Sequence, residues 1–306
     1  MNSFDTLKKL RKTSPSIIAI GTFDGVHSGH RYLLHKLLEY SNSNTENLEP
    51  TVITFNRPPK EIITNQYSPL ICSIEEKKSL LRDIGIKNII SLDFDKEIKQ
   101  LTGEEFILHL KNSLNIHSLV LGEDTFLGND RIGAQNGLKE ILRKIEVSLI
   151  SVSNKEHSDL KISSSYIKKA LMDGDVKKAN LLLERNYILS GQVIEGKKYG
   201  SKLGYPTANI ETKEEKIIPK DGIYKTSTTV DNKEYRSVTS IGDNPTFNET
   251  KKSIETFIVN FDKNIYGKAI KIAFEDFIRD QIKFDDIGDL KRQMSVDVEY
   301  IANSKE

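Results

Sequence analysis

The sequence predicts a two-part fold, in which an α/β domain built on a parallel sheet precedes a small antiparallel β-barrel with a C-terminal helix. Through about residue 185, short apolar runs alternate with amphipathic helical patterns, which is typical of a parallel sheet with helices on both faces. Beyond Tyr187 the pattern changes to short alternating strands separated by turn residues, which is typical of an antiparallel barrel. We therefore expect domains at 1–185 and 186–306.

Each element of the first domain has its own local signal. Strands are predicted where apolar and β-branched residues run together, and helices where apolar residues recur every three to four positions. Two helices open with capping boxes, Ser73-x-x-Glu76 and Thr102-x-x-Glu105. The predicted strands are 17–20, 51–55, 88–92, 117–121 and 147–152, and helices are predicted to begin near 32, 73, 102, 138 and 176.

The second domain is predicted from alternation of apolar and polar residues. Strands are expected at 223–230, 235–241, 254–261 and 269–277, with turn residues between them. A closing helix at about 286–302 has apolar residues at helical spacing, so we expect it to pack on the barrel.

Composition sets limits on partners and location. The 306 residues suit two domains, and 37% hydrophobic with 29% charged residues is ordinary for a globular protein. Since 45 basic residues balance 44 acidic ones, nucleic acid is not an expected partner. Cys72 is the single cysteine, which excludes an internal disulfide and a cysteine-based zinc cluster. Apolar runs of about 18 residues are absent, so we expect no membrane partner and a reducing cytoplasmic location. Self-association is left open.

The most informative stretch runs from Gly21 to His30, Gly-Thr-Phe-Asp-Gly-Val-His-Ser-Gly-His, between the first strand and the first helix. His27 and His30 are three apart at the helix start, so both imidazoles are expected on one face. Unpaired N–H groups at a helix start suit a phosphate, and Gly25 and Gly29 let the backbone approach it. Paired histidines there can donate to the charge that develops as a phosphoanhydride breaks. The stretch predicts nucleotidyl transfer; the alternative is a histidine that only caps the helix.

A second candidate site lies in a glycine-rich stretch of the second domain. Gly196, Gly200 and Gly204 could cover phosphates with backbone amides, although their spacing matches neither a Walker A loop nor a dinucleotide fingerprint. Thr207 and Asn209 alternate along an extended segment and face the same way, where their oxygens would suit Mg²⁺. A glycine-rich turn whose Thr and Asn bond to the backbone explains the same residues equally well.

Glu255 lies in an apolar strand, on the face opposite Ile254. Its functional interpretation is a general base for a substrate hydroxyl, worth about 10²–10⁴ in rate. On the residues alone, a solvated carboxylate at a strand edge is the more common explanation.

These sites, in this order, resemble the prokaryotic bifunctional riboflavin kinase/FMN adenylyltransferase family, also called FAD synthetase. The similarity covers nearly the whole chain. The motifs that carry it are Gly21–His30, Leu121–Asp124, Gly128–Gly133 and Ile162–Ser165 in the first half, and Leu203–Asn209, Pro219–Tyr224, Ile241–Phe247, Ile254-Glu255, Tyr266-Gly267 and Phe277–Arg279 in the second.

The resemblance implies a Rossmann-like nucleotidyltransferase domain followed by a riboflavin kinase barrel, with ATP, riboflavin and FMN as ligands, FMN and FAD as products, and Mg²⁺ as the cofactor. In the kinase, Thr207 and Asn209 would hold Mg²⁺ and ATP phosphates, and Glu255 would activate the ribityl hydroxyl. In the adenylyltransferase, the FMN phosphate would attack the α-phosphorus of a second ATP, while His27 and His30 stabilise the transition state.

The resemblance also implies the remaining site residues. Flavin would contact Asp124 and Arg279. Nucleotide or phosphate would contact Gly21, Phe23, Asp24, Gly25, Gly29, Ser163, Ser164, Lys168, Gly196, Gly200, Gly204, Thr207 and Asn209.

The chain departs from the family's pattern mainly in the first domain. Phe-x-Pro-His-Pro becomes Phe55-Asn-Arg-Pro-Pro59, without the histidine, and Asp-Phe-x-Phe-Gly becomes Asp124-Thr-Phe-Leu-Gly128. Lys168 and Ser201 stand where arginine is usual, and lysine does not replace the bidentate phosphate contact of arginine. Two alternatives therefore stay open: a chain in which only one of the two activities is efficient, and a flavin- or nucleotide-binding regulator without turnover.

Overall fold

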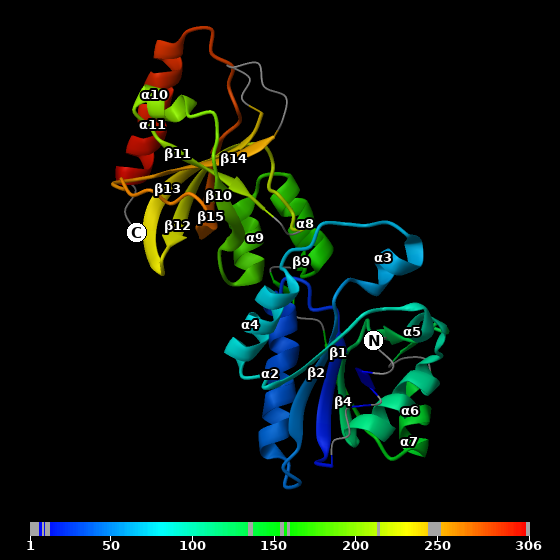
Figure 1. Cartoon of the computed structure of the whole chain (residues 1–306). Coiled ribbons are helices and arrows are strands. Elements are labelled where there is room, and N and C mark those ends of the chain that lie inside the picture. The colour runs from blue at the N-terminus through cyan, green and yellow to red at the C-terminus, as the bar shows by residue number, and fades with distance from the viewer. Residues whose placement is uncertain are drawn as a thin grey trace. The chain divides into compact units, whose positions relative to one another are not determined.

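The computed structural model describes residues 6, 7, 9, 13–133, 137–153, 156–157, 160–212, 215–243 and 252–303 (Figure 1). The chain divides into two compact units, Met1–Ser164 and Ser165–Glu306. This division falls before residue 185, because helix α9 (Val176–Leu183) packs on strands β10 (Tyr187–Ile194) and β15 (Ala269–Arg279) of the second unit. A functional boundary at residue 185 stays a prediction.

The first unit is built on the predicted parallel sheet. Its five strands are ordered β3–β2–β1–β4–β7, and every neighbouring pair is parallel. Since β1 lies between β2 and β4, the connections run in opposite directions from β1, and its carboxyl end is the switch point where such sheets bind ligands. The strands are β1 (Ser16–Gly21), β2 (Glu49–Phe55), β3 (Asn88–Leu92), β4 (Ile116–Gly122) and β7 (Ser148–Val152), and two hairpins are formed by β5 (Phe126–Leu127) with β6 (Ile132–Gly133) and β8 (Glu156–His157) with β9 (Leu160–Lys161).

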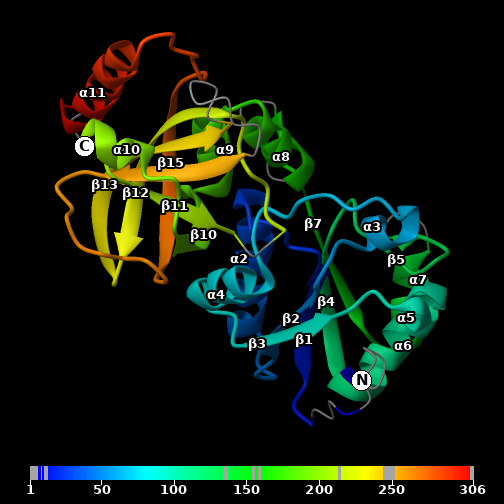
Figure 2. The ribbon, with the colours of Figure 1, turned by 45° about the horizontal axis from the view of Figure 1, so that its top comes forward.

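Helices cover both faces of this sheet, as predicted (Figure 2). Alternate residues of β1 enter two separate cores: Ile17 and Ala19 pack with α2 and α4, whereas Ile18 and Ile20 pack with α6 and α7. Such alternation is expected of a strand that is buried on both faces. The helices are α2 (Ser28–Ser43), α3 (Pro59–Thr64), α4 (Ile74–Ile84), α5 (Lys96–Gln100), α6 (Gly103–Leu114) and α7 (Leu138–Lys144).

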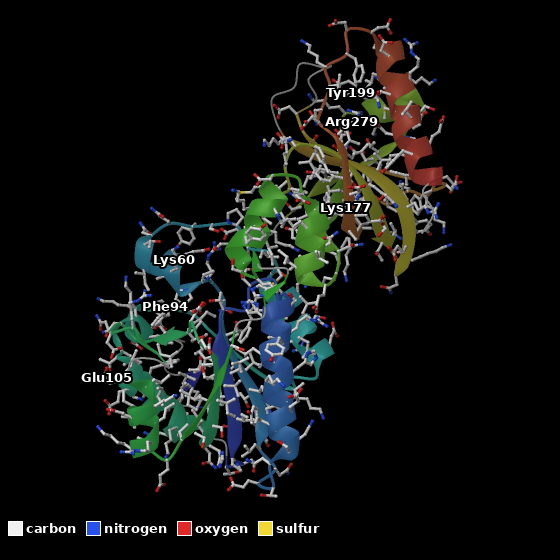
Figure 3. All side chains as sticks on the ribbon, turned by 180° about the vertical axis from the view of Figure 1, so that it is seen from behind. Lys60, Phe94, Glu105, Lys177, Tyr199 and Arg279 are labelled. Carbon is white, nitrogen blue, oxygen red and sulfur yellow. The ribbon has the colours of Figure 1, made fainter. Side chains whose placement is uncertain are left out.

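Both predicted capping boxes are present. At the start of α4, Ser73 Oγ accepts from the Glu76 backbone N–H at 3.2 Å and the Glu76 carboxylate accepts from the Ser73 N–H at 3.1 Å. Thr102 and Glu105 make the same reciprocal pair at the start of α6, where Glu105 is labelled in Figure 3. The hydrogen bonds from the Thr102 backbone and hydroxyl lower the pKa of Glu105. These helix starts are therefore fixed by local sequence.

The second unit is the predicted closed antiparallel barrel followed by a helix. Its six strands are ordered β10–β11–β14–β13–β12–β15, and β15 pairs again with β10 to close the barrel. In the described parts of the chain, no helix is long and apolar enough to span a bilayer. The remaining elements are β11 (Thr207–Glu211), β12 (Gly222–Val230), β13 (Lys233–Gly242), β14 (Ser253–Ile258), α8 (Ser164–Met172), α10 (Tyr199–Leu203) and α11 (Ile287–Asn303).

Strand β10 has no counterpart among the predicted strands. Ser190, Gly191 and Gln192 interrupt its apolar alternation, which hides the strand in the sequence. A side chain at Gly191 would not fit, since a Cβ there would lie 2.5 Å from Ile210 Cγ2. The glycine therefore permits the close approach of β10 to β11.

Candidate active sites

The histidine loop, residues 22–30, joins the carboxyl end of β1 to α2. Phe23, Gly25 and Val26 all have positive φ angles, of 49°, 80° and 41°. A positive φ is ordinary for glycine but a genuine outlier for a β-branched residue such as valine. Backbone in this state persists only where its surroundings hold it, and it gathers at functional sites.

The segment that follows α3 and opens α4, residues 71–77, holds the histidine loop; we call it the brace segment. Asp24 Oδ1 accepts from the backbone N–H groups of Ile71 at 2.9 Å and Cys72 at 3.4 Å. The Gly25 N–H donates to Cys72 Sγ at 3.1 Å, and a Cβ on Gly25 would lie 2.8 Å from Ile71 Cγ2. Gly25, predicted to let a phosphate approach, and Asp24, for which the resemblance implies a nucleotide contact, are thus engaged in fixing the loop.

His27 and His30 form a stacked pair, with ring centroids 3.6 Å apart and planes 16° from parallel. His27 is the N-cap of α2, and its Nδ1 accepts from the His30 backbone N–H at 3.3 Å. A ring nitrogen that accepts a hydrogen bond carries no proton, so a neutral His27 has its proton on Nε2. The two rings lie on one side of the helix start, as predicted, and His27 is also the cap that the alternative interpretation proposed.

The protonation of His30 is biased toward the neutral ring. Burial, followed by the nearby His27 and Lys77, lowers the pKa of His30 well below its usual value. Its Nδ1 is buried and, within the described residues, has no hydrogen-bond partner. The Phe23 ring closes another side at a centroid distance of 5.2 Å. At neutral pH the pair therefore offers N–H donors without adding two positive charges.

Gly21 and Gly29 lie against the Phe23 and His27 rings. Phe23 is buried against Gly21, where a Cβ would lie 3.0 Å from Phe23 Cζ. A Cβ on Gly29 would lie 3.3 Å from His27 Nδ1. Gly21 and Gly29 therefore leave room for the two rings.

Two further groups of predicted residues lie outside the histidine loop. Ser163 and Ser164 are at the start of α8, and Ser164 Oγ donates to the Asp24 carbonyl at 2.9 Å. Lys168 lies further along α8, in the second unit. Asp124 is exposed in the turn that follows β4, the neighbour of β1. The structure therefore brings the α8 start to the histidine loop and leaves Asp124 at the same edge of the sheet.

In the second unit, Thr207 and Glu255 contact each other directly. Thr207 Oγ1 donates to Glu255 Oε2 at 2.9 Å, and Ser253 Oγ donates to Oε1 at 3.2 Å. Asn209 is the register partner of Glu255 across β11 and β14, so both side chains project from the same face. Thr256 points the other way and is fully buried. The three predicted residues thus form one polar group on the outer face of the barrel.

Two of the three predicted glycines allow the backbone to approach this group. A Cβ on Gly196 would lie 2.1 Å from Asn209 Nδ2, and one on Gly200 would lie 2.3 Å from the Tyr205 carbonyl oxygen. Gly204 has a φ of 91°, ends α10 and has open space where a Cβ would be. Gly196 and Gly200 therefore position site residues, whereas Gly204 is a helix C-cap.

A pocket of about 150 Å³ opens beside Thr207. It lies between α10, β11, β14 and the turn after β14, and it combines hydroxyl, apolar and aromatic surface. Residues in its wall include Ser201, Pro206, Thr207, Ile258, Phe261 and Tyr266.

The donors in this group suit a hard cation. Thr207 and Asn209 offer a hydroxyl and an amide oxygen, and Mg²⁺ takes oxygen ligands, keeps several waters and is often held together with substrate phosphates. Over the residues that the structure describes, no cluster of three or more His, Cys, Asp or Glu side chains is placed to hold a metal. The donor set fits a cation that arrives with a nucleotide.

Arg279, predicted to contact flavin, is bound to the C-terminal helix (Figure 3). Its Nε and Nη2 donate to the Asp297 carboxylate at 3.1 and 2.6 Å, and its Nη1 donates to the Asp280 carbonyl. Asp297 is buried on α11 and also accepts from Gln293. Arg279 therefore anchors α11 to the barrel.

Sequence reasoning missed Lys77, a buried lysine of the brace segment. It lies in the run Glu75-Glu76-Lys77-Lys78, which looks like an ordinary charged helix surface. Residues 244–247 of the family motif Ile241–Phe247 lie outside the described residues.

Comparison with known proteins identifies the family. A protein of Buchnera aphidicola subsp. Schizaphis graminum, named bifunctional riboflavin kinase/FMN adenylyltransferase, is 35% identical over 96% of this chain and 95% of its own length. The chain belongs to the bifunctional riboflavin kinase/FMN adenylyltransferase family. The family model for FAD synthetase matches residues 9–166, and that for riboflavin kinase matches residues 183–305.

A second member of the family and one solved structure extend this result. The Bacillus subtilis bifunctional riboflavin kinase/FMN adenylyltransferase is 32% identical over 94% of the chain and 93% of its own length. A crystal structure from Streptococcus pneumoniae, described as a macrolide-efflux protein, superposes with a TM-score of 0.89 at 31% identity, covering 98% of this chain and 97% of that one. These matches confirm the resemblance and the fold predicted from the motifs.

Proposed function

We propose that this chain carries out both reactions for which its family is named. The second unit forms FMN from riboflavin and ATP, and the first forms FAD from FMN and a second ATP, with release of pyrophosphate. The observation that carries the proposal is the presence of two sites of different chemistry: a stacked histidine pair at a helix start, and a carboxylate held by hydroxyls on the barrel.

In the second unit, Glu255 acts as the general base. It takes the proton from the ribityl hydroxyl while that oxygen bonds to the γ-phosphorus and the bond to the β-phosphate oxygen breaks, leaving ADP. The bonds from Thr207 and Ser253 orient its two carboxylate oxygens. Thr207 and Asn209 would hold Mg²⁺ and ATP phosphates, and Mg²⁺ would neutralise phosphate charge. The pocket beside Thr207 would take the rest of the nucleotide.

In the first unit no base is needed, because the FMN phosphate is already an anion. One of its oxygens bonds to the α-phosphorus of ATP while the bond toward the β-phosphate breaks and pyrophosphate leaves. His27 and His30 donate to the charge on the transferring group, and the N–H groups at the start of α2 add to this stabilisation. Ser163, Ser164 and Lys168 would contact phosphate from α8, and Asp124 would contact flavin.

A product assay tests the proposal. The purified chain is incubated with riboflavin, ATP and Mg²⁺, and the flavins are separated by chromatography. We expect FMN and then FAD, with neither formed when the metal is chelated. FMN without FAD, also when FMN is supplied directly, would support a chain with kinase activity alone; no product would support a binding regulator. The cytoplasmic location stays a prediction.

A further inference from the structure

Lys77 is a buried cation directly behind the histidine loop. It lies on α4, which is next to α2 (Figure 2), and it is only 3% exposed. Its Nζ donates to the Phe55 carbonyl at 2.7 Å, to the Thr22 carbonyl at 2.8 Å and to Thr54 Oγ1 at 3.3 Å. A neutral amine has two N–H donors, so three acceptors around one nitrogen indicate an ammonium.

The three acceptors lie at the ends of two neighbouring strands. Thr22 follows β1, and Thr54 and Phe55 end β2. Thr54 Oγ1 itself donates to the Thr22 carbonyl at 3.0 Å, so the ammonium and the hydroxyl together tie the first residue of the histidine loop to β2. Since all three N–H groups of Lys77 are taken by protein atoms, Lys77 has no donor left for a substrate.

We propose that Lys77 is a positioning residue for adenylyl transfer: its ammonium fixes the strand ends beneath the histidine loop and places positive charge beside His30. This inference rests on the function proposed for the first unit. Lys77 acts through the histidine pair and does not touch the nucleotide.

The charges around the pair agree with this role. The positive charge of Lys77 is the third cause, after burial and His27, of the lowered pKa of His30. Burial lowers the pKa of Lys77 itself, while Cys72 and Asp24 of its surroundings act to raise it. His27 and Lys77 are the charged groups that act on His30, and Cys72 and Asp24 are those that act on Lys77. Lys77 thereby helps to keep His30 neutral.

The decisive variant is Lys77→Met, which keeps the length of the side chain and removes its charge. We expect kcat for FAD formation from FMN to fall about 10²-fold, because a displacement of about 1 Å can cost that much. KM for ATP should stay unchanged, since Lys77 does not contact the nucleotide. Riboflavin phosphorylation by the same chain should also stay unchanged, which provides an internal control.

Lys78→Met is the matched control, because Lys78 is the next residue on α4 but pairs with Glu75 at the surface. It removes the same charge from an exposed ion pair of the same helix, and both activities should persist. A second variant, Thr54→Val, removes one acceptor of the ammonium while keeping the charge, and we expect about a tenfold lower kcat for FAD formation. A Thr54→Val chain with wild-type kcat would overturn the proposal even if Lys77→Met failed to fold.

The titration of His30, followed by NMR of the labelled imidazoles, separates positioning from mere structural support. Removal of a positive neighbour makes protonation easier, so Lys77→Met should move the midpoint of His30 upward and shift the acid limb of the FAD-forming pH profile the same way. An unchanged midpoint in a folded Lys77→Met chain would refute the proposal. A wild-type chain that makes no FAD would instead refute the function proposed for the first unit, and the titration would still decide the role of Lys77.

Discussion

The two candidate sites of this chain are built in different ways. In the first unit the histidine loop has positive φ at Phe23 and Val26, and its stacked imidazoles are biased toward the neutral form. In the second unit Glu255 is on a regular strand, held by hydroxyls of Thr207 and Ser253.

The difference follows from the nucleophile that each proposed reaction uses. A sugar hydroxyl has to lose a proton as it attacks, so the barrel site needs a carboxylate base. A phosphate is ionised before it attacks, so the loop needs only donors for the charge on the transferring group. A regular strand is sufficient to orient one carboxylate. To bring backbone N–H groups and imidazole N–H groups together at one phosphate, the chain needs a sharply turned loop and the brace segment that holds it.

The largest expected effect comes from Glu255→Gln, which removes the base and keeps the shape. FMN formation should fall about 10²–10⁴-fold, since that is the usual contribution of a general base. FAD formation from supplied FMN should not change. The exposed Glu234→Gln on β13 serves as the control, and both flavins are measured by chromatography. If Glu255→Gln forms FMN at the normal rate, the barrel site does not use Glu255 as a base, and the proposed difference between the two sites is wrong.

His30→Ala should have the converse effect. FAD formation should fall about 10²–10³-fold, because a donor to the transition state is lost, while riboflavin phosphorylation continues. His35→Ala is the matched control, because His35 is exposed on the same helix. A His30→Ala chain that forms FAD at the wild-type rate would show that the His30 ring does not stabilise the transition state.

Gly196→Ala tests how sharply the barrel site is positioned. The new methyl group would displace the Asn209 amide, which lies 2.1 Å from its place, and we expect a loss of about 10²-fold in kinase activity. Gly204→Ala is the control: its φ of 91° makes alanine cost about 1 kcal/mol in folding free energy, but the methyl group meets open space. Equal kinase losses in the two variants would indicate a folding defect instead.

Arg279→Met tests whether the ion pair between Arg279 and Asp297 stabilises the second unit. It leaves the buried Asp297 carboxylate without its main partner, so the free energy of unfolding of the second unit should fall by about 3 kcal/mol. The double variant Arg279→Met, Asp297→Leu should recover most of this loss, as measured by denaturant unfolding. If Arg279→Met raises KM for riboflavin with no change in stability, Arg279 contacts flavin, as the family resemblance implies.

The smallest effect concerns pH and distinguishes the loop from the barrel. Since the pKa of His30 is lowered in the folded chain, the unfolded state binds more protons between that pKa and the ordinary value near 6.5. The free energy of unfolding of the first unit should therefore rise with pH through this window. Below the window, this contribution of His30 is lost. Amide hydrogen exchange of β1 would measure the effect, and His30→Gln should flatten it. If the stability measured by exchange of the β1 amides in the wild-type chain does not change with pH, the lowered pKa of His30 is contradicted.

Much of the fold could be predicted because its signals are local. The strands of the first unit are short segments rich in apolar and β-branched residues, and the capping boxes at Ser73 and Thr102 mark where two helices begin. Strand β10 could not be predicted, because Gly191 is required by the approach of a neighbouring strand and breaks the pattern.

The candidate sites were predictable in their residue types but not in their contacts. The spacing of His27 and His30 predicts rings on one face, and alternation predicts that Thr207 and Asn209 share a face. No pattern reveals that Asp24 bonds to a segment far along the chain, or that Lys77 is buried in a charged run. Arg279 finds Asp297 only because the barrel and α11 fold together.

The closure of the barrel also determines where copies of this chain could join through backbone pairing. Each barrel strand already has a neighbour on both sides, so strand addition there would first require breaking an existing ladder. In the described part of the first unit, the sheet instead ends at β3 and β7, each paired on one side. On heating or at high concentration, we expect intermolecular sheet growth to start from these two margins.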